Sequence, residues 1–142
     1  SEEADVRCLF VGDRIGEFRG ATADGAKVYT LWDAYPHADF VTYPSLYEGF
    51  GNAFLETLYF RKPILVNRYS VYTRDIQPLG FRVVEMDGVV TGEVVRQVEG
   101  VLDSPKETAE MVEENYALAL RYFSHRVLRG TLGQLVRELF GG

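Results

Sequence analysis

Short runs of apolar residues, separated by glycine, proline and charged residues, recur along the first two-thirds of the chain. Runs of this length that are bounded by turn residues are typical of strands buried on both faces of a sheet. The glycine- and charge-rich segment 12–25 is predicted to be a loop. The pattern predicts five strands, at residues 7–11, 27–29, 39–43, 64–66 and 81–85.

Between and after these runs, apolar positions recur three or four residues apart, which is the period of an α-helix. One predicted helix has a strong start, because Ser104 is a good N-cap and Pro105 suits the first helical position. Ser124 is expected to cap the last helix. The spacing predicts helical segments at residues 31–35, 52–61, 91–102, 105–123 and 124–139.

This alternation of strands and helices predicts an α/β fold. We expect a parallel sheet of about five strands with helices on both faces, followed by a C-terminal helical segment. The sequence shows no internal repeat and no long linker, so residues 1–142 are expected to form a single domain. In such a sheet, ligands bind beyond the carboxyl ends of the strands. The loops that follow the strands are therefore where a site is expected.

Composition argues against several classes of protein. The chain has 142 residues, 46% of them apolar, which is enough for a buried core. Its net charge of -6 argues against a nucleic-acid partner. No apolar run reaches about 18 residues, so neither a membrane-spanning helix nor a signal peptide is expected. Cys8 is the single cysteine, which excludes an internal disulfide. A cytoplasmic location fits these features.

The loop after the predicted third strand carries the most chemistry. Gly49 and Gly51 flank Phe50 where the strand gives way to a helix, and glycine permits positive φ and a close approach of the backbone to a ligand. The helix offers N–H groups and the positive end of its dipole, which suit a phosphate or pyrophosphate. Glu48 and Glu56 bracket this turn. The pattern predicts a ligand with hydroxyl groups at both ends and phosphates between them.

A purely structural interpretation of the same residues stays open. The two glycines would then serve only a tight turn, which is common before helices, and Glu48 would be a solvated loop residue. Glu56 would pair with one of three arginines further along the chain, Arg61, Arg68 or Arg74. Arg68 and Arg74 would either assist phosphate binding or form surface salt bridges.

The residues around this loop resemble a known family. Residues 44–51 (Pro-Ser-Leu-Tyr-Glu-Gly-Phe-Gly), followed by Glu56, resemble the E-x-x-x-x-x-x-x-E motif of retaining glycosyltransferases with two Rossmann-like domains, the GT-B architecture. This family, glycosyltransferase group 1, includes sucrose synthase, sucrose-phosphate synthase and many bacterial mannosyl- and glucosyltransferases. His125 stands where the family has a tryptophan. Other segments resemble the family as well, at residues 38–41, 62–66 and 123–124.

The resemblance implies a Rossmann-like donor-binding domain for a nucleotide sugar, in an enzyme that transfers a hexose. It implies that Glu48 contacts the transferred sugar as the catalytic residue and that Glu56 binds the ribose hydroxyls. No cofactor and no metal are implied, because the nucleotide sugar is a substrate and the helix end and basic side chains neutralise the leaving diphosphate. The residues implied to bind the substrate are Glu48, Gly49, Phe50, Gly51, Asn52, Ala53 and Glu56.

The chain departs from the family before its first predicted strand. The sequence given lacks the strand–helix unit that carries a phosphate-binding arginine and lysine, and it lacks the acceptor-binding N-terminal domain, a partner in cis. We therefore expect a fragment of a longer enzyme that is inactive alone and whose open sheet edge favours self-association. Asn52 stands where many relatives are aliphatic, and we expect it to cap the helix. Tyr29 or Leu31 is expected to border the nucleotide base.

Other classes of protein share parts of this pattern. Sugar-nucleotide epimerases and phosphorylases have the same two-domain architecture, but the Glu48 and Glu56 pattern is closer to the transferases. A phosphorylase would also need a lysine for pyridoxal phosphate, and no segment suggests one. A non-catalytic, flavodoxin-like binding domain would carry an acidic cluster at the end of its first strand, where Asp13 alone is found.

Overall fold

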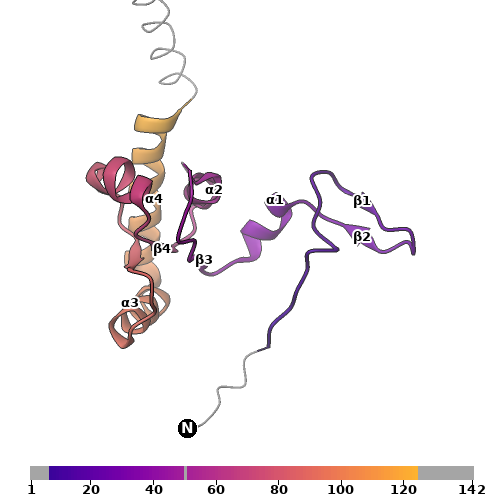
Figure 1. The fold of residues 1–142 in the computed structure, drawn as a ribbon, viewed down its shortest axis with the longest axis horizontal. Coiled ribbons are helices and arrows are strands. Elements are labelled where there is room, and N and C mark those ends of the chain that lie inside the picture. Colours follow the sequence, from indigo (N-terminus) through magenta and orange to yellow (C-terminus); the bar gives the residue numbers. More distant parts are fainter. Residues whose placement is uncertain (1–6, 50, 125–142) are drawn as a thin grey trace, which may run out of the picture. The chain divides into compact units, whose positions relative to one another are not determined.

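The computed structural model describes residues 7–49 and 51–124 of the chain (Figure 1). The described residues fall into two compact units, one ending at Ala38 and one beginning at Asp39, and each unit is described by itself. In these ranges no helix combines the length and the apolar character needed to cross a membrane.

The first unit contains a short antiparallel hairpin and a little helix. Asp33 accepts a hydrogen bond from the backbone N–H of Thr30 at 2.9 Å, which fixes the start of the helix, and it also pairs with Arg19. Among the described residues of this unit, Tyr35 is the one buried hydrophobic side chain. The unit therefore has little core. Its elements are β1 (Gly20–Ala21), β2 (Lys27–Val28), α1 (Leu31–Ala34) and the 3-10 helix η1 (Tyr35–His37).

Two of the five predicted strands do not join the parallel sheet. Residues 7–11 form no strand, and Phe10 is 94% exposed. An apolar run becomes a strand only where a neighbouring strand supplies hydrogen bonds and another layer covers its side chains, and the described part of this unit supplies neither. Residues 27 and 28 do form a strand, but β2 pairs antiparallel with β1. The prediction of about five parallel strands was therefore wrong in number.

The second unit contains the predicted α/β arrangement. Its parallel sheet has the strand order β3-β4-β5, with Thr42 beside Leu65 and Leu65 beside Val84 in register. All four residues of the middle strand are buried, as expected for a strand that is covered on both faces. The α/β class and the parallel sheet are confirmed. The strands are β3 (Val41–Tyr43), β4 (Ile64–Asn67) and β5 (Val84–Met86).

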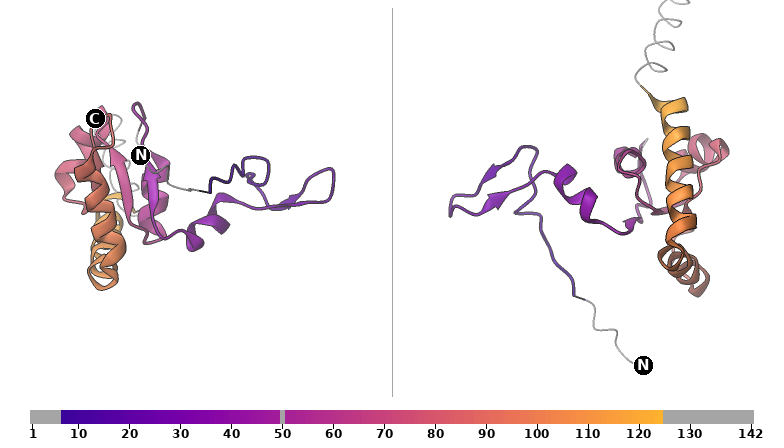
Figure 2. Two further views of the ribbon diagram at one scale, coloured as in Figure 1. Left: turned by 90° about the horizontal axis from the view of Figure 1, so that it is seen from below. Right: turned by 180° about the vertical axis from the view of Figure 1, so that it is seen from behind.

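Helices cover both faces of this sheet (Figure 2). Because side chains alternate along a strand, Ile64 and Val66 face one side and Leu65 faces the other. The first side packs on α2 (Asn52–Tyr59), on the irregular turns η2 (Tyr72–Ile76) and η3 (Gln77–Leu79), and on the second half of α4 (Pro105–Phe123). The second side packs on α3 (Gly92–Asp103) through Val94.

The starts of the last two described helices agree with the sequence. Thr91 caps α3 by accepting a hydrogen bond from the backbone N–H of Val94, and Ser104 is the N-cap of α4, although its hydroxyl makes no capping bond. The hydroxyl of Thr108 instead donates to the carbonyl of Val101 at 2.6 Å and joins the two helices. The predicted final helix and its residue 125 lie outside the described residues.

Candidate functional site

The predicted site lies at the carboxyl ends of β3 and β4. Tyr43 is the last residue of β3 and Asn67 the last of β4, while Gly51 immediately precedes α2. The loop that carries Glu48 runs from the end of β3 to this helix. This edge is where a parallel sheet with helical crossovers binds ligands.

Two tyrosines interact with the carboxylate of Glu48. Burial raises the pKa of Tyr43 to about 12, together with a hydrogen bond that its phenol donates to Glu48 and the charge of that carboxylate. Burial also raises the pKa of Tyr69, and the negative charge of Glu48 adds to this shift. The rings of Tyr43 and Tyr69 meet edge to face, with centroids 6.4 Å apart. Glu48 is therefore held in a half-buried, structured setting and is not a freely solvated loop residue.

Both the backbone conformation at residue 51 and the atoms close to it favour a glycine at this position. Its φ of 85° lies in the left-handed region, which favours glycine. A Cβ atom at this position would lie 2.6 Å from the hydroxyl oxygen of Tyr69 and 3.5 Å from the ring of Tyr43. The atoms next to Gly51 are therefore those of two tyrosines, and the close approach of this backbone to a ligand stays a prediction. Gly49 differs, because it is exposed, its φ is not positive and a Cβ would meet no atom within 4 Å.

The start of α2 corrects one prediction. Gly51, and not Asn52, is the N-cap, and no side chain caps the helix. The carbonyl of Gly51 accepts the N–H of Phe54 at 3.0 Å, so Asn52 is already the first residue inside the helix and is exposed. The left-handed turn at Gly51 has taken the position that a capping asparagine would occupy. Ala53 follows it in the first turn, where the positive end of the helix dipole lies, and Phe50 lies outside the described residues.

Glu56 lies on α2, half-buried, one helical turn after Asn52. The three arginines considered as its partners have carboxylates of their own. Arg61 pairs with Glu113 at 2.6 Å, and Arg74 pairs with its neighbour Asp75. Arg68 lies 3.8 Å from Glu85, which favours the salt-bridge interpretation of that residue over phosphate binding.

Asn67 is a residue of this edge that sequence reasoning did not single out. It is only 3% exposed, and its amide group bonds two different loops. Its Nδ2 donates to the carbonyl of Ser45 at 3.1 Å, in the loop after β3, and its Oδ1 accepts from the N–H of Gly88 at 2.8 Å, in the loop after β5. The available signal was an asparagine at the end of the apolar run 64–66, where a polar side chain is buried only if it is bonded.

A second cluster of polar side chains lies at the same end of the sheet, around Glu85 of β5. Its carboxylate accepts hydrogen bonds from the phenol of Tyr72 at 2.6 Å and from the amide of Gln77 at 2.8 Å. Burial, followed by this bond to Glu85, raises the pKa of Tyr72. The side chain of Arg68 completes the group. These contacts fix the irregular turns η2 and η3 against the end of β5.

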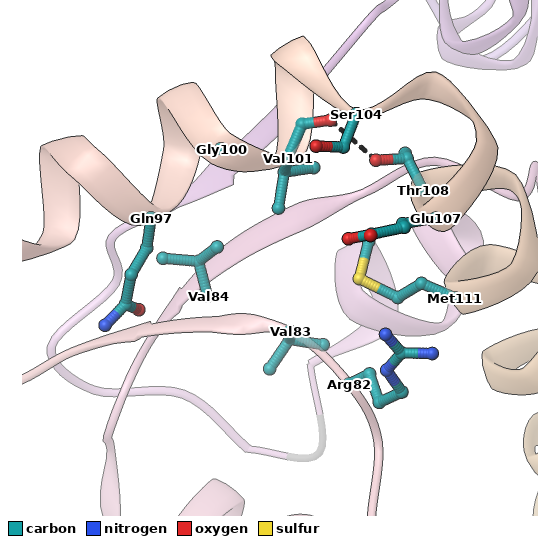
Figure 3. Close-up of a pocket in the computed structure, with 10 residues that line it drawn as sticks. All are labelled: Arg82, Val83, Val84, Gln97, Gly100, Val101, Ser104, Glu107, Thr108 and Met111. Carbon is teal, nitrogen blue, oxygen red and sulfur yellow. Dashed lines mark hydrogen bonds between the residues drawn. The ribbon is translucent and has the colours of Figure 1, made fainter.

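A cavity of about 530 Å³ lies at the opposite, amino end of β5 (Figure 3). Val84, Val101 and Met111 give it apolar walls, and Arg82 and Glu107 are among its charged lining residues. It is formed between β5, the end of α3 and the start of α4. None of its lining residues belongs to the predicted site. In the part of the chain that the structure describes, no three side chains suited to a metal lie together.

Tyr29 and Leu31, predicted to border the nucleotide base, belong to the first unit and are both more than 40% exposed. Trp32 of the same unit is exposed as well. The aromatic residues of this stretch differ in their exposure. Tyr35 is buried, whereas Tyr43 belongs to the candidate site of the second unit.

Two curated relatives are similar to the chain. It is 53% identical over 60 residues to the mannosylglucosylglycerate synthase of Petrotoga mobilis, an alignment that covers 42% of this chain and 14% of that protein. It is 33% identical over 119 residues to the mannosylglucosylglycerate synthase of Thermotoga maritima, covering 75% of this chain and 28% of that protein. No family profile and no solved structure matches the chain. The chain spans less than a third of either relative and is homologous to a part of these synthases.

Proposed function

We propose that this chain is the donor-binding part of a retaining glycosyltransferase of the GT-B architecture, which binds a nucleoside diphosphate sugar. Its homologues are glycosyltransferases, since their name describes a product in which sugars are joined to glycerate. The observation that carries the proposal is the position of Glu48. It accepts a hydrogen bond from Tyr43 and its charge acts on Tyr69, at the carboxyl end of a parallel sheet and in the loop before α2.

In this proposal the donor lies along the turn between β3 and α2. Glu48 contacts the hydroxyls of the transferred sugar, and Glu56, one helical turn into α2, binds the ribose. The backbone from Gly49 to Ala53, including Phe50, contacts the sugar and the diphosphate. The positive end of the α2 dipole offsets part of the diphosphate charge, which grows as the diphosphate leaves.

The reaction proposed is the transfer of a hexose with retention at its anomeric carbon. The bond between that carbon and the diphosphate oxygen breaks, and an acceptor hydroxyl forms the new bond on the same face while its proton passes to the leaving diphosphate. The relatives' name suggests a mannosyl group as the hexose and glucosylglycerate as the acceptor. The acceptor would be held by an N-terminal domain in cis, and no cofactor is needed because the nucleotide sugar is itself the substrate.

The proposal is tested with the protein that contains this chain. We expect it to transfer mannose or glucose from one of the nucleoside diphosphate sugars to glucosylglycerate, as followed by release of the diphosphate and by mass spectrometry of the product. Calorimetry with UDP, GDP and ADP would identify the base, with Glu56→Ala weakening the binding of the preferred nucleotide. A well-folded protein that binds none of the three and transfers nothing would overturn the proposal. Conversion of the donor to an epimer without an acceptor would assign the chain to the epimerases.

A further inference from the structure

We propose that Asn67 is a positioning residue, which ties the loops after β3, β4 and β5 to one another and so holds Glu48 against Tyr43. The role of Glu48 toward a sugar rests on the proposed function, whereas the contacts that position Glu48 are independent of that proposal. Asn67 touches neither carboxylate of the predicted motif in any contact described above, and its effect on the site passes through the loops that it binds.

The place of Asn67 in the sheet explains why a single side chain reaches both neighbouring loops. β4 is the middle strand, so the end of β4 lies between the end of β3 and the end of β5. An asparagine amide offers a donor and an acceptor at once, and here the donor goes to Ser45 and the acceptor to Gly88. Both bonds are partly shielded from water, because the Asn67 side chain is only 3% exposed.

The contacts continue from Asn67 to Glu48 by two routes. On the first, Asn67 holds the backbone of Ser45, the Ser45 side chain bonds the phenol of Tyr43, and that phenol donates to Glu48. On the second, which uses the main chain and does not depend on the amide group, the backbone carbonyl of Asn67 accepts the N–H of Tyr69 at 2.9 Å in a tight turn. That turn directs Tyr69 toward Gly51 and into the field of the Glu48 charge.

The chain offers a matched control in Asn115 of α4. This asparagine is 2% exposed and also makes two hydrogen bonds to backbone, accepting from the N–H of Arg82 at 2.8 Å and donating to the carbonyl of Arg82 at 2.7 Å. It lies outside the predicted site. Removing either amide group leaves two backbone groups without their partners, so a similar general loss of stability is expected from both substitutions.

The test compares Asn67→Ala with Asn115→Ala in the protein that contains this chain. The first readout is the pH titration of the Tyr43 phenol, followed by the NMR signal of its ring carbon and assigned with Tyr43→Phe. We expect Asn67→Ala to lower the pKa of Tyr43 from about 12 toward its usual value near 10, because the phenol is released from burial and from Glu48. Asn115→Ala should leave that pKa unchanged. An unchanged pKa in Asn67→Ala would overturn the inference.

The second readout is transfer. Asn67→Ala is expected to lower kcat by about ten- to a hundredfold, the effect of a misplacement near 1 Å, while Asn115→Ala leaves kcat unchanged. Equal kcat values for the two variants would also overturn the inference. If the unsubstituted protein transfers no sugar but the Tyr43 pKa still falls in Asn67→Ala, the proposed function fails and the positioning role stands.

A second pair of variants covers the case in which Asn67→Ala does not fold. Asn67→Leu keeps the size of the side chain and adds no charge, but it loses both the donor to Ser45 and the acceptor for Gly88. Asn115→Leu makes the same change at Arg82. We expect Asn67→Leu to lower the pKa of Tyr43 and Asn115→Leu to leave it unchanged, and the opposite pattern would contradict the proposed link through Ser45.

Discussion

A buried asparagine makes two hydrogen bonds to the backbone at each end of the parallel sheet, and the two asparagines bind different kinds of partner. At the carboxyl end, Asn67 joins Ser45 and Gly88, which lie 22 and 21 residues away from it in different loops. At the amino end, Asn115 binds the N–H and the carbonyl of one residue, Arg82. The first arrangement fixes the relative positions of separate loops. The second attaches one helix to the start of one strand.

The surroundings of the two ends differ in the same way. Around Asn67 stand phenols, a carboxylate and a glycine in a left-handed turn, whereas around Arg82 lie valines, a methionine and an exposed ion pair with Glu114. The same amide chemistry therefore supports a polar, constrained edge in one place and ordinary packing in the other. Substitutions at the carboxyl end are expected to affect the site, and those at the amino end to affect stability alone.

The largest effect is expected from Glu48→Gln at the carboxyl end. Loss of the carboxylate charge should lower kcat for sugar transfer by about 10²- to 10³-fold, the range measured when one stabilising group of a transition state is removed. The matched substitution at the amino end is Glu114→Gln, which breaks an exposed ion pair with Arg82 and should leave kcat unchanged. Initial-rate measurements at saturating donor check both variants. Equal rates would remove the distinction between the two ends.

The next effect is expected from Gly51→Ala. The left-handed φ costs an alanine about 1–2 kcal/mol, and its Cβ would lie 2.6 Å from the hydroxyl of Tyr69, which is 2% exposed. We expect the free energy of unfolding in urea to fall by more than the backbone strain alone. Removing that hydroxyl with Tyr69→Phe should recover the steric part of the loss. Gly49→Ala is the control, because nothing lies within 4 Å of its Cβ and its stability should change little.

The third effect is confined to alkaline solution. The pKa of Tyr43 is about 12 in the folded protein and near 10 in an unfolded chain. The folded state therefore favours the neutral phenol, and the stability that this provides is complete below pH 10 and is lost as the pH rises from 10 to 12. The free energy of unfolding, measured at several pH values, should fall less steeply in Tyr43→Phe than in the unsubstituted protein. A slope that is the same in both would contradict the raised pKa.

The smallest effect is expected at the amino end. Gly100 lies within α3 at the edge of the cavity, and a Cβ there would meet no atom within 4 Å. Because glycine is less favourable than alanine inside a helix, Gly100→Ala should raise the free energy of unfolding by about 0.5–1 kcal/mol. The substitution should leave kcat and the pKa of Tyr43 unchanged. A change in either would mean that the two ends of the sheet are coupled.

The elements of the second unit could be predicted because their signals are local. The apolar run at residues 64–66 lies within β4, and the Ser104–Pro105 pair marks the start of α4. Thr91 caps α3 next to the predicted start. The run at residues 7–11 carries the same local signal but forms no strand, because pairing depends on a partner strand that the run itself does not encode.

The place of the glycine turn could be predicted from the sequence, but the side chains that surround it could not. Gly51 was expected to approach a ligand, and the structure places the hydroxyl of Tyr69 beside it. These two residues are far apart in sequence, and they come into contact because β3 and β4 pair in register. The pairing of two distant strands cannot be predicted from a local sequence pattern. The same holds for Asn67, whose partners lie in two other loops. Asn52 was expected to be the cap because asparagine is common there, but the left-handed turn of Gly51 precedes it.

The central position of β4 has a consequence for how the molecule opens. The amide hydrogens of a buried middle strand exchange with solvent only when the largest cooperative unit unfolds, whereas surface helices and loops exchange through smaller, local fluctuations. Asn67 belongs to that strand, but Ser45 and Gly88 lie in loops, so the bonds that join the loops can break before β4 unfolds. On heating, the candidate site is therefore expected to lose its order at a lower temperature than the sheet.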